Sequence, residues 1–417
     1  MIKLLPFGLD RKLKALITPQ KALTIQNYIF FFRNKLKAIS KARKQVPLLL
    51  NVNAVNELNY RKRALFIWRD TPFLVPEDDP EFLRHQNLRQ CRQIAALLGE
   101  LGYVVDVSDV KDKKFRPSGH YDLIINTKPE LKYGKSVSQN QAIKIFLALA
   151  LNNSAHNKNL RRRHKLLYER RKSRLMYRKI FNEKMPYVAI SDALICFGNE
   201  SIMSTWKDAF KGPSYPFNNY GFKETKFIFE SKNFKTARKN FLYFASRTQM
   251  QKGLDLLLEV FPKHPSLNLF ICSYYKLERD FCACYYKELF ETSNVHPMGW
   301  ISVNSPEYCD LIEKCAYVIL PSCAEGSAGS VVQCMYSGLI PLVTKEAGID
   351  TEDFGVTFAD DSLEEIERVI IEVSEKPETW HREHSIRTHE VSVKKYSEDA
   401  FINRWRDMLA EILNSTR

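Results

Sequence analysis

Residues 319–348 read ILPSCAEGSAGSVVQCMYSGLIPLVTKEAG and contain the strongest pattern in the chain. A short apolar run ends at Pro321 and Ser322, a turn of small residues follows, and a second apolar stretch begins near Gly329. This order predicts a buried strand, a tight turn and a helix with an uncovered start. The first turn of a helix carries about half a positive charge, so a phosphate fits there. We therefore expect the N–H groups of Gly329 and Ser330 to bind phosphate.

Short apolar runs separated by helix-length segments extend from this stretch in both directions. Their branched residues predict parallel strands, and the segments between them predict helices on both faces of each sheet. Ligands of such sheets bind outside the carboxyl ends of the strands. We therefore expect two doubly wound α/β domains that face a central cleft. The expected strands are residues 64–68, 103–107, 121–126, 143–151 and 193–197 in one half, and residues 241–246, 268–274, 295–300, 316–322 and 339–344 in the other.

Gly, Pro and Asn are concentrated in GPSYPFNNYGF (212–222), which predicts a linker between the two halves. The expected organisation is therefore a basic helical N-terminal extension over residues 1–60, a first Rossmann-like domain over 61–222, and a second over 223–417. The second domain includes the helices predicted at the C-terminus.

In the N-terminal extension, apolar residues recur at helical spacing between Ile25 and Phe32, and several lysines and arginines follow. Two interpretations of this pattern stay open. The helix lies on an anionic membrane surface, or it packs against the next domain with its lysines in water.

The net charge of the 417 residues is +15, and it is concentrated in two segments. Residues 1–63 carry a net charge of +12 and residues 156–184 carry +10, so the remainder is mildly acidic. Such patches favour an anionic partner, although solvated helix faces give the same pattern. Charge alone does not predict nucleic-acid binding, and we expect no such partner. The arginines of the second segment that we consider for an anionic acceptor or lipid are Arg161, Arg162, Arg163, Arg170 and Arg171.

The nine cysteines are odd in number and several lie in apolar segments. They predict reduced thiols and a cytoplasmic location. Cys282 and Cys284 lack a second Cys or His pair at metal-ligand spacing, so we expect no metal site there.

The turn after the 316–322 strand resembles the signature of the family 4-type, or group 1, glycosyltransferases, whose two-Rossmann-domain architecture is called GT-B. Glu325 and Gly326 match the first part of that signature, and Gln333 stands where the family has a second Glu. The resemblance implies that Glu325 contacts the donor sugar and that residue 333 holds the ribose. A Gln can bind a ribose hydroxyl but lacks the strength of a charged acceptor, which implies weaker donor binding. The remaining matches are Met335, Gly338, Pro341 and Gly348.

Upstream, Arg247 follows a predicted strand, and Lys252 precedes the next helix in FASRTQMQKGLDLLLEVF. The same family resemblance places such a pair on the diphosphate of the donor. Two fixed cations can stabilise the negative charge that a departing nucleoside diphosphate gains, without a metal. His156, which follows the strand ending near Leu151, resembles a family histidine beside the transferred sugar. A buried structural histidine is the other interpretation of His156.

The resemblance implies a GT-B glycosyltransferase that moves a hexose-type sugar from a nucleoside diphosphate sugar to an acceptor hydroxyl, with retention and without a metal or other cofactor. The N-terminal domain would bind the acceptor and the C-terminal domain the donor. The expected acceptor is a surface polysaccharide or lipid-linked glycan at the cytosolic membrane face. Two alternatives stay open. Gln333 suggests a nucleotide-sugar-binding protein with weak or lost turnover, and the same fold would also suit an epimerase.

Overall fold

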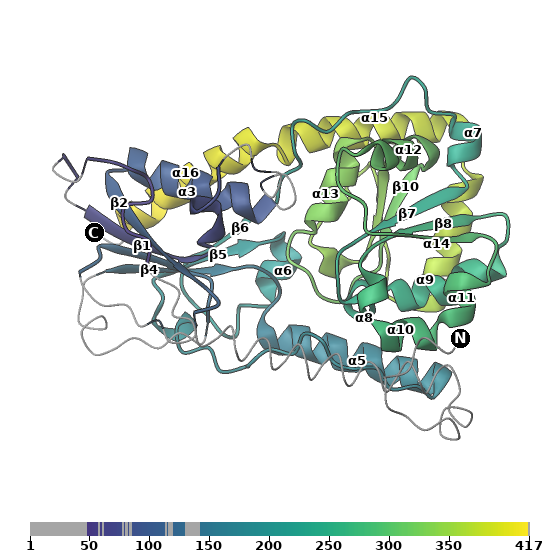
Figure 1. Ribbon diagram of the computed structural model, residues 1–417, viewed down its shortest axis with the longest axis horizontal. Helices are drawn as coiled ribbons and strands as arrows, with labels where there is room; N and C mark the ends of the chain where they lie inside the picture. Colours follow the sequence, from purple (N-terminus) through teal and green to yellow (C-terminus); the bar gives the residue numbers. More distant parts are fainter. Residues whose placement is uncertain are drawn as a thin grey trace, which may run out of the picture.

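The computed structural model describes residues 48–415, except 57–58, 61, 77–78, 80–81, 83–85, 113–114, 116–119 and 130–141. The basic helix that we expected within residues 1–60 therefore lies largely outside the described residues. The chain forms two lobes, each built on a parallel six-stranded sheet with helices on its faces (Figure 1). In the described residues, no helix is both long enough and apolar enough to cross a bilayer.

The first sheet has the strand order β2-β1-β3-β4-β5-β6, and every neighbouring pair is parallel. Of its inner strands, β3 and β5 are buried along their whole length, and β1 and β4 are buried from their third residue on, as the apolar runs predict. Its strands are β1 (Lys62–Trp68), β2 (Tyr103–Asp109), β3 (Leu123–Asn126), β4 (Ile143–Ala148), β5 (Ala193–Phe197) and β6 (Ser214–Phe217). The helices between them are α3 (Gln86–Glu100), α5 (Asn153–Arg171) and α6 (Glu200–Ser204).

The second sheet has the order β12-β11-β10-β7-β8-β9 and is also parallel throughout. Its strands are β7 (Asn240–Phe244), β8 (Asn268–Cys272), β9 (Val295–Gly299), β10 (Tyr317–Leu320), β11 (Ile340–Val343) and β12 (Val356–Thr357). Its helices are α7 (Phe234–Ala237), α8 (Gln249–Lys252), α9 (Leu254–Val260), α10 (Arg279–Cys284), α11 (Tyr286–Phe290), α12 (Pro306–Lys314), α13 (Gly329–Tyr336), α14 (Leu363–Glu375) and α15 (Glu378–Lys395).

The predicted linker 212–222 contains a strand, which corrects the expectation from its composition. Strand β6 pairs with β5 and closes one edge of the first sheet. Tyr215 and Phe217 point into the core, while Pro216 alternates with them. Proline is tolerated there because the outer side of an edge strand needs no ladder N–H. The chain therefore leaves the first domain only after Phe217.

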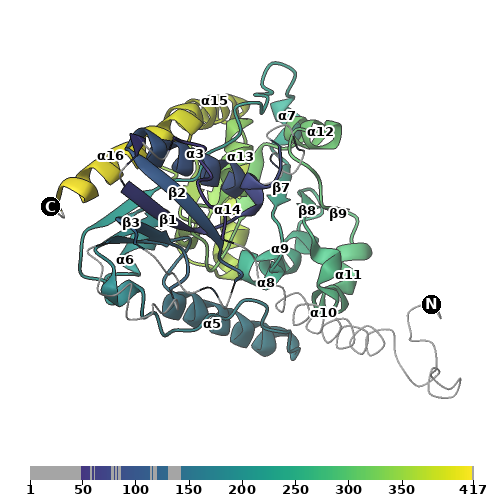
Figure 2. The same cartoon turned by 60° about the vertical axis from the view of Figure 1, so that its left-hand side comes forward.

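The last helix, α16 (Glu398–Ser415), packs on the first domain rather than the second, where we expected the C-terminal helices. Phe401, Trp405 and Met408 are buried in the same cluster as Phe217 of β6. Figures 1 and 2 show α15 over the second lobe and α16 beside α3 of the first. The chain thus crosses between the lobes twice, after β6 and between α15 and α16.

Helix α5 also connects the lobes, along a different face (Figure 1). It begins at the carboxyl end of β4, where the Asn152 side chain accepts a hydrogen bond from the Ser154 N–H at 2.9 Å. It ends at Arg171, and Lys172 follows in a left-handed conformation (φ 52°) that stops the helix. Its C-terminal half packs on the second domain, because Leu167 belongs to that domain's core.

Candidate active site

A cavity of about 510 Å³ lies between the two lobes. The residues that follow β4, β5, β7, β9 and β10 line it, so it lies outside the carboxyl ends of strands from both sheets, as expected. Seven predicted site residues reach this cavity: Arg247, Lys252, Glu325, Gly326, Gly329, Ser330 and Gln333. The eighth, His156, is not part of its lining.

Among the described residues that line the cavity, Glu325 is the only acidic one. Its Oε1 atom accepts a hydrogen bond from Lys252 Nζ at 2.6 Å and weaker ones from Gln251 Nε2 and Ser322 Oγ, both at 3.3 Å. Burial alone would raise the pKa of Glu325, but the charges of Lys252 and Lys179 hold it below its usual value. The carboxylate is therefore ionised. No described residue donates a hydrogen bond to Oε2, which is left for a ligand hydroxyl.

Domain–domain contacts fix the loop that carries Glu325. Three of its carbonyl groups accept hydrogen bonds from the N-terminal domain, at 3.1, 2.9 and 2.9 Å. Leu151 N–H donates to the Glu325 carbonyl, Asn159 Nδ2 to the Cys323 carbonyl, and Arg163 Nη2 to the Pro321 carbonyl. The loop is therefore held in place by the lobe opposite to the one from which it comes.

Gly326 allows the lobes to approach closely at this loop. A Cβ atom on Gly326 would lie 2.5 Å from the carbonyl oxygen of Leu149 and 2.8 Å from that of Phe197. Both carbonyls belong to the first domain, so any side chain here would push the lobes apart.

Arg247 lies at the exposed side of the cavity and has no ion pair with a described residue. Its guanidinium carbon is 5.7 Å from the ring centre of Tyr274, which stacks on Trp300 with 5.4 Å between ring centres. The next residue, Thr248, has a positive φ of 69°, which is unusual for a β-branched residue. The Glu278 carboxylate holds this bend by accepting hydrogen bonds from the N–H groups of Thr248 and Gln249.

The start of α13 is open toward the cavity. Ala328 precedes it and offers no side-chain cap, and its carbonyl accepts only from the N–H groups of Val331 and Val332. In the described residues, no acceptor meets the N–H groups of Gly329 and Ser330. Such a helix start is suited to an anion.

Gln333 is completely buried at the wall of the cavity. Its Oε1 atom accepts a hydrogen bond from the Phe222 N–H at 3.0 Å, and its Nε2 atom donates to the Thr225 hydroxyl. Both contacts hold the chain segment that connects the domains. A carboxamide has two donor hydrogens and two acceptor positions, so half of its capacity is used here.

His156 lies behind the cavity wall, in the first turn of α5. Its Nε2 atom is 2.9 Å from the carbonyl oxygen of Lys179, to which it donates, and its ring meets Phe181 edge-on with 4.7 Å between ring centres. Burial, together with the positive charge of Lys179, lowers the pKa of His156 to about 4. The imidazole is therefore neutral at pH 7, and it contacts the backbone of a residue that lines the cavity.

Lys179 is a charged cavity residue that the sequence analysis missed. It lies between α5 and β5, and its side chain is the one cation that the N-terminal domain contributes to the lining. Nothing in the sequence distinguishes it from the other basic residues of 156–184.

The five α5 arginines that we considered for an anionic acceptor or lipid are all paired with carboxylates. Arg163 is fully buried between Asp255 (3.5 Å) and Asp361 (2.9 Å) of the second domain. The other pairs are Arg161 with Glu183, Arg162 with Asp361, Arg170 with Asp255 and Glu259, and Arg171 with Glu259 and Glu288. Except for Arg161, they join α5 to the second domain.

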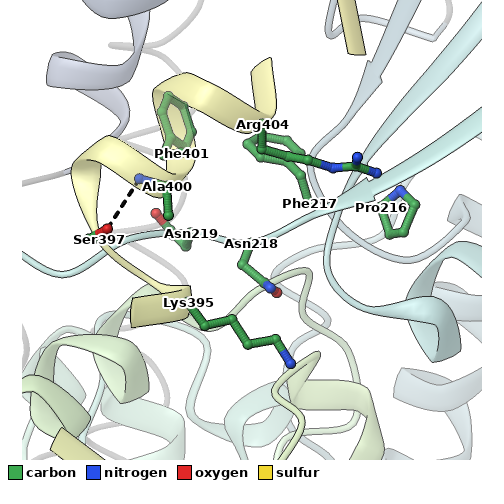
Figure 3. Close-up of a pocket in the computed structure, with 9 residues that line it drawn as sticks. All are labelled: Pro216, Phe217, Asn218, Asn219, Lys395, Ser397, Ala400, Phe401 and Arg404. Carbon is green, nitrogen blue, oxygen red and sulfur yellow. Dashed lines mark hydrogen bonds between the residues drawn. The ribbon is translucent and has the colours of Figure 1, made fainter. Parts of the chain in front are cut away.

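A second cavity, of about 210 Å³, lies where β6 leaves the first domain (Figure 3). Lys395 and Arg404 extend along it beside Asn218. Lys395 is engaged with Asp350 and Glu352 at 3.2 and 2.8 Å. Asn219 lines both cavities, and its amide donates a hydrogen bond to the Ser327 carbonyl. This cavity holds none of the predicted site residues and borders the connection between the lobes.

All nine cysteines are free thiols, and seven of them are buried. This agrees with the reduced state expected from their number and placement.

Among known protein families, a match is found for the second domain. Residues 225–385 match the family model described as glycosyl transferases group 1. No curated protein sequence matches the chain.

Solved structures resemble the fold at low sequence identity. Sucrose-phosphate synthase from Thermosynechococcus elongatus has a TM-score of 0.56 and 11% identity, covering 85% of this chain and 100% of its own. HepE from Anabaena, solved with UDP-glucose, has a TM-score of 0.52 and 13% identity, covering 85% and 99%. WaaG, a glycosyltransferase involved in lipopolysaccharide biosynthesis, has a TM-score of 0.51 and 12% identity, covering 84% and 99%.

The match to TarM covers 69% of this chain and 54% of TarM, so the chain spans about half the length of that protein. The likeness to the other three structures extends over both lobes and identifies the fold as GT-B-like. By this match, the second domain is similar to the group 1 glycosyl transferases over residues 225–385.

Proposed function

We propose that this protein is a glycosyltransferase that transfers a hexose-type sugar from a nucleoside diphosphate sugar to an acceptor hydroxyl. One observation carries the proposal: Arg247, Lys252, Glu325 and the open start of α13 line the same cavity between the lobes. These groups come from two separate segments of the second domain, 247–252 and 325–330, and together they suit a diphosphate attached to a sugar.

The diphosphate lies between the Arg247 and Lys252 side chains and the N–H groups of Gly329 and Ser330. In the transfer, the bond between C1 and the diphosphate oxygen breaks and its electron pair stays on the diphosphate. The acceptor oxygen bonds to C1, and the hydroxyl proton passes to the departing phosphate. The two cations and the helix start stabilise the added negative charge, so the reaction needs no metal.

Glu325 binds the donor sugar. Lys252, Gln251 and Ser322 hold Oε1, so the carboxylate is fixed and Oε2 faces outward to accept a sugar hydroxyl. Gln333 binds the ribose with the remaining capacity of its amide. The stacked pair Tyr274 and Trp300 offers an aromatic surface for the base at the Arg247 side. His156 acts indirectly: its hydrogen bond to the Lys179 carbonyl fixes the part of the cavity wall beside the sugar.

The N-terminal domain binds the acceptor. We propose a surface polysaccharide or lipid-linked glycan, made at the cytosolic membrane face, with retention of configuration. The HepE structures that share this fold hold UDP and glucose or UDP-glucose, and WaaG acts in lipopolysaccharide biosynthesis, which supports a sugar nucleotide and a glycan. The pairing of the α5 arginines leaves the basic N-terminal segment as the support for membrane contact.

A thermal-shift screen with uridine, guanosine and adenosine diphosphates and their sugars tests donor binding, because a ligand stabilises the fold in proportion to its occupancy. Release of nucleoside diphosphate on adding glycan acceptors tests transfer. Glu325→Ala and Arg247→Ala should each abolish that release. A wild type that binds nucleotide but transfers to no acceptor would favour the inactive binding protein that Gln333 suggests. Sugar epimerisation without an acceptor would favour the epimerase.

A further inference from the structure

We propose that Lys179 is a third phosphate-binding residue, which the N-terminal domain contributes to the donor site. This inference rests on the proposed function and deepens it, because it assigns a diphosphate contact to the lobe opposite Arg247 and Lys252. The lysine would bind the phosphate that is attached to the sugar.

The backbone of Lys179 is firmly fixed. His156 donates a hydrogen bond to its carbonyl oxygen at 2.9 Å, and Asn157 binds the backbone on the far side of Ile180, where its Oδ1 accepts from the Phe181 N–H at 3.0 Å. The side chains that make these two hydrogen bonds, His156 and Asn157, lie near the start of α5, which Asn152 caps. The side chain then lines the cavity together with Lys252 and Glu325.

The ammonium group of Lys179 has no direct partner in the described residues, where it makes neither an ion pair nor a hydrogen bond. The ring of Phe181 is its nearest recorded contact, with 5.6 Å from Nζ to the ring centre. Burial lowers the pKa of Lys179, and the positive charge of Lys252 lowers it further. The negative charge of Glu325 raises it, but by less than burial lowers it. Lys179 is half-buried. A partly buried cation without a partner is costly, and a bound anion lowers that cost.

Charge balance supports a diphosphate as that anion. In the part of the chain that the structure describes, three cations line the cavity, and Glu325 is the one carboxylate among the lining residues, already bound to Lys252. The set therefore carries a net charge of about +2, which matches the two negative charges of a diphosphate joined to a nucleoside and a sugar. When the bond to C1 breaks, the leaving group gains further negative charge, and a third cation then stabilises it more than two would.

The contact also gives His156 a role. Its neutral imidazole holds the Lys179 carbonyl, so it is a positioning residue for the third cation and does not itself touch the donor. The phosphate would then bind to both lobes at once, and donor binding would favour the closed arrangement of the domains.

The test is calorimetric titration of the full-length protein with uridine diphosphate and uridine monophosphate, replaced by the guanosine or adenosine pair if these bind more tightly. Lys179→Gln should weaken diphosphate binding about 10- to 100-fold, and monophosphate binding less than about threefold. Lys179→Arg should recover most of the loss. Lys184→Gln is the matched control, because Lys184 belongs to the same segment but is exposed.

Unchanged diphosphate affinity in Lys179→Gln, with a loss in Arg247→Gln, would overturn this inference and leave the proposed function intact. An effect on the acceptor KM alone would overturn it as well, and assign the lysine to the acceptor. A wild type that binds none of the diphosphates would contradict the proposed function and this inference together. Unfolding curves of the variants show whether an affinity loss comes from misfolding.

Discussion

The basic residues of α5 and those of the cleft have the same side-chain chemistry but different partners. On α5, Arg163 is fully buried and bound to two carboxylates of the other domain. In the cleft, Arg247 and Lys179 have no ion pair with a described residue. Lys252 has one ion pair, with Glu325. Four of the α5 arginines (Arg162, Arg163, Arg170 and Arg171) pair with carboxylates of the second domain and hold the domains together, whereas the cleft retains positive charge for a ligand. The availability of a cation, rather than the number of cations in a segment, indicates a binding site.

The largest effect should follow a change in the α5 pairs. Arg163→Met removes the fully buried arginine between Asp255 and Asp361, and should lower the free energy of unfolding by about 3 kcal/mol. The two carboxylates keep Arg170 and Arg162 as their remaining partners. Arg161→Met, two residues away, removes an exposed pair and should cost no more than about 1 kcal/mol. Urea denaturation measures both. Equal losses would mean that the buried network does not hold the domains together.

In the cleft, the same kind of change should affect turnover rather than stability. Arg247→Gln should lower turnover by about 100- to 1,000-fold, because the departing diphosphate loses a fixed cation. Its free energy of unfolding should change by less than about 0.5 kcal/mol, since Arg247 is exposed. Release of nucleoside diphosphate and urea denaturation give the two values. Arg161→Gln is the control on α5, and an equal loss of turnover there would remove the distinction between the two groups of cations.

Acid should weaken the α5 contact through two buried histidines. Burial and the nearby charge of Lys179 lower the pKa of His156 to about 4, and burial and Arg178 lower that of His164 to about 4. The unfolded chain takes up these protons near pH 6.5 and the folded chain does not. Stability should be complete above about pH 6.5 and fall by up to about 3 kcal/mol per histidine as the pH drops to about 4.

Unfolding free energies measured from pH 7 to pH 4 check this slope. Replacing both histidines with Gln should make the curve flatter over this range than in the wild type. A wild-type curve that is already flat would mean that these histidines accept protons in the folded protein.

The smallest effect concerns Gln333, where the cleft meets the connection between the domains. Gln333→Glu keeps the acceptor for the Phe222 N–H and lets the Thr225 hydroxyl donate, while adding a charged acceptor for the ribose. Uridine diphosphate should bind up to about fivefold more tightly, as calorimetry would show. The 2′,3′-dideoxy form lacks the ribose hydroxyls and should gain nothing. An equal gain for both nucleotides would contradict a ribose contact.

Much of this fold could be predicted because local pattern determines it. The buried strands of both sheets are continuous apolar runs, and the Glu325 turn has a distinctive run of small residues before α13. Strand β6 was missed because Pro216 and the surrounding Gly and Asn residues indicate a loop, while its pairing with β5 depends on a partner 20 residues away. The placement of α16 depends on contacts with the first sheet, which its own sequence does not show.

The cavity lining was predictable only where a local motif marked it. Arg247 and Glu325 follow the ends of strands β7 and β10, Lys252 ends helix α8, and all three lie in recognisable surroundings. Lys179 is one of twelve Lys and Arg residues in 156–184, and only the fold separates it from those that pair with carboxylates. Those carboxylates lie far along the chain: Arg163 pairs with Asp255 and Asp361, at separations of 92 and 198 residues.

The central claim is that the cleft binds the diphosphate of a sugar nucleotide through side-chain cations and backbone N–H groups. A crystal structure of the protein with uridine diphosphate, or with whichever diphosphate binds most tightly in the thermal-shift screen, tests it most directly. The account predicts phosphate oxygens at about 3 Å from Arg247, Lys252 and the N–H groups of α13, with no divalent ion between them. A nucleotide bound elsewhere, or one whose phosphates contact a metal instead of these groups, would contradict it.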